Sequence, residues 1–384
     1  MAGAKPRLCV LIPSHWSGTR GGAELQVRML VERLISLDTF DVHLVARNID
    51  PHHVPAGYTL HRIPSLKAAV GTFLLDVPSL WGVLWRLQPH VIYQRVACAY
   101  TGTAAYYARR HHRRMVWHVS NDLDLMPIPW RLSLRSPLEQ LDQRLVDYGA
   151  RRADAIIVQT SAQAELLRCN YGRSDAVHIS NFHSAPAGPP TKALDRLVVC
   201  WIANIKPTKQ PEFFLRLAAD LRNRSNVELH MVGALHMKRK AWESLLARMG
   251  NLPNLQCSGF QADDAIDKLL STAAVLVNTS YVEGFPNTFI EAWLREVPVV
   301  SLSVNPDGVF DEDRFGICAH GSYERLRDAV ERLIANPILR AQMGQRASVL
   351  ARERFSERNI EQVIQVISQR DKSSLHDTTA TADR

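Results

Sequence analysis

Short apolar runs recur along the chain, and they alternate with longer stretches whose apolar residues are spaced three and four positions apart. The runs are bounded by Gly, Pro and polar residues and predict buried strands, whereas the spaced stretches predict amphipathic helices. Such alternation is typical of a parallel sheet with helices on both faces. In the first half the predicted strands are Leu8–Ile12, Val42–Ala46, Tyr58–Ile63, His90–Val96, Met115–Ser120, Ala155–Gln159 and Ala176–Ser180.

A second alternation follows a stretch rich in Pro, Gly and Ala, Asn181–Lys192, which we interpret as a linker. With 384 residues the chain is long enough for two domains, each with its own core. We place them at 1–181 and 196–355, joined by a linker at 182–195, and we expect the polar residues 371–384 to be disordered. Predicted strands here are Leu197–Ile202, Val227–Val232, Leu255–Ser258, Ala274–Asn278, Val297–Leu302 and Gly316–Ala319, and helices are Glu324–Ala335, Ile338–Arg354 and Ser356–Gln369.

The most informative stretch is the strand–loop–helix–strand unit Ala274–Leu302. Its loop, Thr279–Pro286, follows the carboxyl end of a strand, which is where open α/β sheets bind ligands. The loop and the helix after it would present backbone N–H groups that favour a phosphate. Glu283 in the loop could then contact the group beyond the phosphates, and Glu291 in the first turn of the helix could accept from the hydroxyls of a ribose.

The same residues also allow an interpretation without a ligand. Asn287 or Thr288 can cap a helix that runs through Glu296, and Thr288-x-x-Glu291 has the spacing of a capping box. Glu283 would then be a solvated loop carboxylate. Both interpretations remain open on the residues alone.

Charge is unevenly distributed. The net charge is +8, and residues 1–180 contain 21 Lys and Arg against 14 Asp and Glu, whereas the remainder has 25 against 24. A basic first half favours an anionic partner: a membrane surface, a lipid phosphate or a nucleic acid. We expect no nucleic acid, because neither a recognition module nor a pattern of stacking aromatics is evident.

A basic cluster, Arg109–Arg114, concentrates this charge at the end of a predicted helix, and Arg131, Arg135, Arg151 and Arg152 extend it. Cations at a helix C-terminus are favourable locally, so the cluster is either structural or a phosphate-facing patch. Val70–Leu87, which includes Trp81 and Trp85, is predicted as a helix that is either packed in the core or facing lipid.

Six scattered cysteines form no Cys-x-x-Cys pair, which fits thiols in a reducing cytoplasm and predicts no zinc site. We expect no signal peptide, because the apolar run Leu8–Ile12 stops at Pro13, and no apolar run approaches the length of a membrane span. These observations predict a cytoplasmic protein.

Two further loops carry candidate chemistry. The first, Pro13–Gly22, contains Gly18, Gly21 and Gly22, which suggests close approach of a ligand or a plain tight turn. It lacks the Gly-x-Gly-x-x-Gly spacing, and the next strand ends at Arg47 rather than at an acid, so a dehydrogenase is disfavoured.

The second loop, His118–Asp124, offers Asp122-x-Asp124 as a metal-binding pair, although a helix-capping role is favoured over a metal.

The segment EGFPNTFIEAW (283–293), followed by a small turn and PVV, resembles the motif of two Glu separated by seven residues in the retaining glycosyltransferases of family 4. The resemblance implies the GT-B fold, an α/β architecture of two facing Rossmann-like domains with parallel sheets and a C-terminal helix, here 356–370, that crosses back to the first. It also implies that Glu291 binds the nucleotide ribose and that Glu283 contacts the donor sugar. The backbone of Phe285, Asn287 and Thr288 would hold the diphosphate.

Other positions gain roles through this resemblance. Lys209 matches a Lys that clamps the diphosphate, but Asn204 stands where the family usually has an Arg, so Lys206 or Arg20 is expected to supply that charge, or catalysis to be weaker. The family also often has a His near the acceptor at the end of the strand that here contains His118. In this sequence His118, Asn121 or Asp122 could occupy that place, so the resemblance implies an acceptor-side role for the Asp122-x-Asp124 segment as the alternative to helix capping. Donor-side roles fall on Gly21, Gly22, Gly233 and Phe260.

The implied activity is retaining transfer of a sugar from a nucleotide-diphosphate donor to a glycan or lipid-linked acceptor, in bacterial polysaccharide or glycolipid synthesis. No metal or other cofactor is expected, because Lys209 and backbone N–H groups would neutralise the diphosphate. The basic first domain is expected to bind the inner face of the membrane peripherally. Two alternatives remain: a GT-B nucleotide-sugar epimerase, and a non-catalytic membrane-associated assembly partner, which the Asn204 departure suggests.

Overall fold

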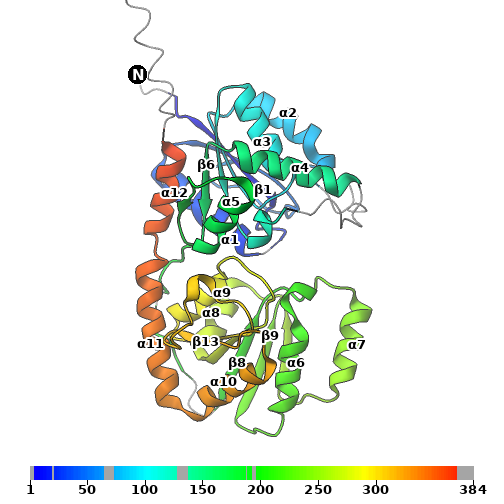
Figure 1. The fold of residues 1–384 in the computed structure, drawn as a ribbon, viewed down its shortest axis with the longest axis vertical. Coiled ribbons are helices and arrows are strands. Elements are labelled where there is room, and N and C mark those ends of the chain that lie inside the picture. Colours follow the sequence, from blue (N-terminus) through cyan, green and yellow to red (C-terminus); the bar gives the residue numbers. More distant parts are fainter. Residues whose placement is uncertain are drawn as a thin grey trace, which may run out of the picture. The chain divides into compact units, whose positions relative to one another are not determined.

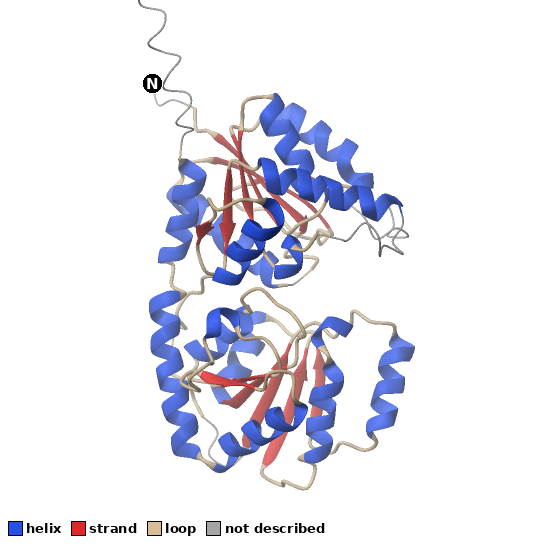
Figure 2. Cartoon of the chain, viewed as in Figure 1, coloured by secondary structure: helices blue, strands red, loops and turns tan. Residues whose placement is uncertain are grey.

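The computed structural model describes residues 4–19, 21–64, 73–127, 137–186, 188–192 and 196–369. Contacts divide the chain into two units, one drawn from Met1–Ile179 and Arg358–Arg384, the other from Ser180–Glu357. Each unit contains one sheet with helices packed against it (Figure 2). The α/β class predicted from the alternating pattern is therefore confirmed in both halves.

The first unit is built on a seven-stranded sheet in the order β3-β2-β1-β4-β5-β6-β7. Every neighbouring pair of strands is parallel. Its strands are β1 (Arg7–Ser14), β2 (Asp41–Arg47), β3 (Thr59–Arg62), β4 (Val91–Arg95), β5 (Arg114–His118), β6 (Ala155–Val158) and β7 (Val177–His178). Its helices are α1 (Gly22–Leu37), α2 (Val77–Leu87), α3 (Ala99–Arg110), α4 (Pro137–Arg152), α5 (Ser161–Tyr171) and α12 (Arg358–Ser368), with 3₁₀ turns η1 (Leu74–Asp76) and η2 (Asp122–Leu125).

Helices on both sides explain why the central strands of this sheet are largely buried. Residues Leu8–Ile12 of β1 are fully buried, as expected for a parallel strand covered on two faces. Helices α2, α3 and α4 lie together on one side, and α12 packs against α1 (Figure 1). An ion pair between Arg33 and Glu361 and a hydrogen bond from Arg114 to the carbonyl of Val366 (3.0 Å) fasten α12 to the first unit, so the expected return of the C-terminal helix is found.

The second unit has a six-stranded parallel sheet in the order β10-β9-β8-β11-β12-β13. Its strands are β8 (Leu197–Ile202), β9 (Val227–Val232), β10 (Leu255–Gly259), β11 (Ala273–Asn278), β12 (Val299–Ser301) and β13 (Gly316–Cys318). Its helices are α6 (Pro211–Asp220), α7 (Arg239–Met249), α8 (Asp263–Thr272), α9 (Asn287–Leu294), α10 (Tyr323–Ala335) and α11 (Pro337–Arg354), with 3₁₀ turns η3 (Pro207–Lys209) and η4 (Pro306–Gly308). Helix α7 lies outermost, beside α6 (Figure 1).

Strand order reverses once in each sheet. In the first sheet the chain runs outward from β1 to β3 and then returns to place β4 on the other side of β1. In the second it runs from β8 to β10 and returns to place β11 beside β8. Ligands of open α/β sheets bind at these reversal points, outside the carboxyl ends of the strands.

The predicted start of α9 is wrong. Neither Asn287 nor Thr288 caps the helix; Pro286 is the N-cap residue, with φ −64° and ψ 123°, and no side chain makes a cap hydrogen bond. The helix therefore begins at Asn287 and ends at Leu294, short of the predicted Glu296. Glu291 consequently lies in the second turn rather than the first.

The segment after the first sheet is anchored to the second unit by Lys192. Its Nζ donates to the carbonyls of Ala273 (3.0 Å) and Arg295 (2.8 Å), which are the C-cap residues of α8 and α9. A cation is favourable at a helix C-terminus, and here one ammonium group binds the C-termini of two helices. Loss of hydration around the ammonium group nevertheless lowers the pKa of Lys192 to about 8, although the residue as a whole is exposed.

The sequence left open whether residues 70–87 form a packed helix or one that faces lipid. Helix α2 buries Leu80, Val83, Leu84 and Leu87 and leaves Trp85 56% exposed, so it is a packed helix with one exposed aromatic; residues 70–72 of the predicted helix lie outside the described part. Among the described helices, none combines the length and the apolar character needed to cross a bilayer.

All six cysteines are free thiols, and Cys169 and Cys257 are exposed.

Candidate active site

Two loops meet at the reversal point of the second sheet, one after β8 and one after β11. The hydroxyl of Thr279 donates to the carbonyl of Lys209 (2.6 Å) and accepts from the indole N–H of Trp201 (2.8 Å). The backbone N–H of Tyr281 donates to the carbonyl of Thr208 (3.0 Å). These bonds hold the two loops in register, so side chains from both are presented at one place.

Lys209 and Glu283 form an ion pair across this junction. Their side chains are only 16% and 14% exposed, and Glu283 also accepts a hydrogen bond from the hydroxyl of Ser280 (2.8 Å). Lys209 is the last residue of η3, which starts at Pro207, a residue whose fixed φ suits the first position of a helix. The structure thus brings together the two residues that the sequence singled out from separate loops.

Glu291 lies on α9 and contacts His183, a residue of the segment that joins the two units. The distance from His183 Nε2 to Glu291 Oε1 is 3.3 Å, and the side chains are 14% and 21% exposed. Because α9 has no side-chain cap bond, the capping-box interpretation of Thr288 and Glu291 is wrong. The carboxylate of Glu291 is therefore available for another role.

The loop between Glu283 and α9 is tightly packed. The Phe285 ring is 5% exposed and packs on Phe355, with ring centroids 4.6 Å apart, while its carbonyl accepts from Asn181 Nδ2 (2.9 Å). Only the backbone of Phe285 can therefore serve a ligand. The N-terminal end of a helix dipole favours an anion, and the backbone N–H groups of Asn287 and Thr288 lie at that end of α9.

Gly233 is required where β9 ends. Its φ is 154°, and a Cβ added there would lie 1.7 Å from the carbonyl oxygen of Ala203, the residue before Asn204. Asn204 itself is half-buried in the loop after β8. Phe260 follows the edge strand β10, which is separated from β8 by β9, and its side chain is 51% exposed.

The glycines of the first loop behave differently from one another. Gly21 is the N-cap of α1 in an extended conformation, and Gly22 is the first helical residue, so neither position requires glycine by its backbone angles. Gly18 does require it, because an added Cβ would lie 1.7 Å from the carbonyl oxygen of Asn48. Arg20 lies outside the described residues.

His118 ends β5 and is fully buried. Its Nδ1 lies 2.8 Å from the hydroxyl of Tyr93 and 3.5 Å from Nη1 of Arg95. Burial, and then the charge of Arg95, hold the pKa of His118 well below its usual range, so the ring is neutral. In this structure it does not reach the surface where an acceptor would bind.

Residues after His118 cap the short turn η2. Asn121 accepts from the N–H of Leu123 (2.9 Å), and Asp124 accepts from the N–H and hydroxyl of Ser120 (2.9 and 2.8 Å). Asp122 accepts from Gln163 Nε2 (3.0 Å), so the two aspartates face different partners. Within the described residues no group of three or more His, Cys, Asp or Glu side chains is arranged to hold a metal ion.

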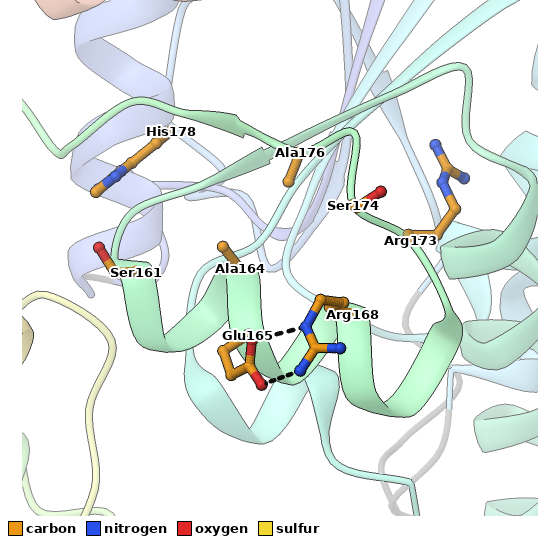
Figure 3. A pocket seen from close by; sticks show the side chains of 8 residues that line it. All are labelled: Ser161, Ala164, Glu165, Arg168, Arg173, Ser174, Ala176 and His178. Atoms are coloured by element: carbon orange, nitrogen blue, oxygen red, sulfur yellow. Dashed lines mark hydrogen bonds and ion pairs between the residues drawn. The ribbon is translucent and has the colours of Figure 1, made fainter.

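A hollow of about 250 Å³ lies between α5 and β7, and none of the predicted site residues lines it (Figure 3). Its charged side chains are already paired: Arg168 with Glu165 (2.5 Å) and Arg173 with Asp175 (2.7 Å). We therefore place the candidate site at the Lys209–Glu283 junction and not here.

Sequence reasoning missed the residues that organise the junction. Thr279 and Ser280 belong to a polar run directly after a buried strand, which was a usable signal. His183 had no such sequence signal, because it lies in a stretch that composition assigns to a linker. Its contact with Glu291 arises only from the tertiary fold.

Two units with parallel sheets of this kind define the GT-B fold, and comparison with solved structures agrees. Anabaena HepE, in a crystal structure with UDP and glucose, superposes with a TM-score of 0.74 over 94% of this chain and 99% of that one, at 19% identity. Residues 188–349 match the family model of glycosyl transferases group 1, and residues 21–183 match the glycosyl transferase 4-like domain. The chain belongs to the group 1, family 4-like glycosyltransferases.

The relatives of named activity match this chain over only part of their own length. The poly(ribitol-phosphate) alpha-N-acetylglucosaminyltransferase of Staphylococcus aureus (strain COL) is 25% identical over 227 residues, 57% of this chain and 44% of that protein. The alpha-D-kanosaminyltransferase of Streptomyces kanamyceticus is 26% identical over 164 residues, 42% of each chain. The chain thus spans less than half the length of these relatives.

Proposed function

We propose that the protein transfers a sugar from a nucleotide-diphosphate donor to an acceptor hydroxyl, with retention at the anomeric carbon. The observation that carries the proposal is the Lys209–Glu283 ion pair at the reversal point of the second sheet, with Glu291 on the helix that follows. The family membership and the likeness to a fold seen with UDP and glucose support it.

Donor binding exchanges partners within this site. A diphosphate carries more negative charge than the carboxylate of Glu283, so it can take over the ammonium group of Lys209. The N–H groups at the start of α9 add favourable donors for the same phosphates. Glu283, released from Lys209, then faces the donor sugar, and Glu291 accepts from the ribose hydroxyls.

The chemical step needs stabilisation of a leaving group rather than a strong base. The bond between the anomeric carbon and the phosphate oxygen breaks, and negative charge grows on the nucleoside diphosphate, where Lys209 and the helix N-terminus stabilise it. The acceptor oxygen attacks from the same face, and its proton passes to the leaving phosphate oxygen. No metal and no protein base is assigned a step.

We further propose that the acceptor is a glycan or a lipid-linked glycan, in bacterial polysaccharide or glycolipid synthesis. Similarity in fold to WaaG, a glycosyltransferase involved in lipopolysaccharide biosynthesis, supports such an acceptor. A lipid-linked acceptor would require the protein to work at a membrane surface.

The outer surface of α2 and α3 supports peripheral binding at the cytoplasmic face of the membrane. Trp85 and Tyr106 are 56% and 54% exposed, and Arg109 and Arg110 are exposed at the end of α3. Basic groups near an anionic bilayer contribute about 1 kcal/mol each, and exposed aromatic rings favour the interface. Arg114 is excluded from this surface because it binds the carbonyl of Val366, and Arg131 and Arg135 lie outside the described residues.

Incubation with a panel of UDP-, GDP-, ADP- and dTDP-sugars, with and without oligosaccharide and lipid-linked acceptors, tests the proposal. We expect acceptor-dependent release of one nucleoside diphosphate, and NMR of the product should show the anomeric configuration of the donor. Formation of an altered nucleotide sugar without acceptor would instead establish an epimerase. An inverted product would contradict retention while leaving glycosyl transfer intact.

A further inference from the structure

We propose that His183 is a positioning residue for Glu291: it holds one carboxylate oxygen so that the other faces the ribose of a bound nucleotide. This inference rests on the proposed function, because it assumes that Glu291 contacts the ribose. It assigns a role in donor recognition to the segment that connects the two units.

The backbone around His183 is fixed at two places. Asn181 is 3% exposed, and its Nδ2 donates to the carbonyl of Phe285 (2.9 Å) in the loop that follows Glu283. The N–H of His183 donates to the carbonyl of Phe355 at the end of α11 (2.8 Å). The connecting segment, which its composition assigns to a linker, is therefore docked on the loop after Glu283 and on the end of α11.

The side chains of His183 and Glu291 meet in a largely enclosed place. Nε2 of His183 is buried, lies 3.3 Å from Oε1 of Glu291, and has no aligned hydrogen-bond partner in the structure. A buried ring nitrogen next to a carboxylate is stabilised if it carries the proton and faces the negative charge. In the proposed arrangement this contact engages Oε1 and leaves Oε2 as the acceptor for a hydroxyl.

Orientation matters because a glutamate side chain has several rotamers, and a ligand that must select one of them binds more weakly. Groups in direct contact are commonly coupled strongly enough to change affinity by about tenfold. We therefore expect loss of the imidazole to weaken nucleotide binding through Glu291, without any contact between His183 and the nucleotide.

Calorimetric titration of the full chain with UDP tests this directly, with GDP, ADP and dTDP as further probes. His183→Phe should weaken binding by about tenfold. His183→Gln, whose amide can donate to the same oxygen, should restore affinity to within about threefold of wild type. His230→Phe is the matched control: His230 Nε2 lies 3.7 Å from Glu228 in the same unit, with side chains 20% and 35% exposed, and its loss should leave affinity unchanged.

A double-mutant cycle separates positioning from a general structural effect. If His183 acts through Glu291, adding His183→Phe to Glu291→Gln should cause no further loss of UDP affinity. Thermal unfolding of each variant confirms that it is folded.

Wild-type affinity in His183→Phe, or a full additional loss in the Glu291→Gln background, would overturn the inference but leave the proposed function standing. If the wild-type protein binds none of the four nucleotides, the proposed function fails and the inference fails with it.

Discussion

Replacing Lys209 with methionine should abolish most of the turnover while leaving a folded protein. The substitution removes the ammonium group but keeps an unbranched side chain of similar reach. The charge that Lys209 stabilises is larger in the transition state than in the bound donor, so kcat should fall more than donor affinity. Removing one such donor typically costs a factor of about 100 to 1,000 in kcat, or about 2.7–4 kcal/mol.

The structure adds a second consequence. In Lys209→Met the carboxylate of Glu283, which is 14% exposed, keeps the hydroxyl of Ser280 but loses its ion-pair partner. A buried polar group left without its partner costs about 1–3 kcal/mol, so the free energy of unfolding should fall by about that amount. In Lys209→Met with Glu283→Gln the orphaned charge is gone, so stability should recover while turnover stays low.

Nucleoside diphosphate release at saturating donor and acceptor measures kcat, and denaturant unfolding measures stability. Arg196→Ala is the matched control, because Arg196 pairs with Glu228 just before β8 and thus at the opposite end of the strand that leads to Lys209. This control should retain normal kcat. A Lys209→Met enzyme with near wild-type kcat would refute the assignment of Lys209 to the leaving group.

Four further outcomes are expected. Glu291→Gln should weaken UDP binding by about tenfold with little change in stability, because the carboxylate does not cap α9; unchanged affinity by calorimetry would contradict the ribose role. Activity should survive EDTA, and a complete loss restored by magnesium or manganese would show that a metal is required. Lys192 has a pKa of about 8, below the ordinary 10.5, so its charged form opposes folding below about pH 8 and this penalty fades as the pH rises to 10.5. The side chain of Lys192 is partly exposed and water screens the penalty, so the unfolding free energy of wild type relative to Lys192→Met should rise by only about 1 kcal/mol across that range. A flat difference in denaturant titrations would contradict it. Anionic vesicles should bind the protein reversibly with salt, and Arg109→Glu with Arg110→Glu should release it; no binding of the wild type at low salt would favour a soluble acceptor.

The fold could be predicted from sequence because its central strands are buried on both faces and therefore appear as continuous apolar runs. The bounds of β8 and β9 coincide with the predicted ones. The start of α9 could not be predicted by its polar residues, because Pro286 turns the chain into the helix before Asn287 or Thr288 can act as caps.

The site was only partly predictable, because some of its contacts join residues that are far apart in the sequence. Lys209 and Glu283 both follow strands, so the topology of a parallel sheet was enough to expect them at the same edge. His118 also ends a strand, but its side chain turns inward against Tyr93. A strand that is apolar on both sides gives no sequence signal for which way its last residue faces. The contact between His183 and Glu291 depends on how the connecting segment docks, which its composition does not encode.

The distribution of thiols makes motion between the two units measurable in the unmodified protein. Of the six free cysteines, Cys169 in α5 and Cys257 in β10 are exposed, one in each unit, while Cys9, Cys98, Cys200 and Cys318 are buried. Exposed thiols react with maleimide dyes and buried ones do not. A donor and an acceptor fluorophore can thus be attached at native positions, and energy transfer between them would report any change in separation as UDP is added.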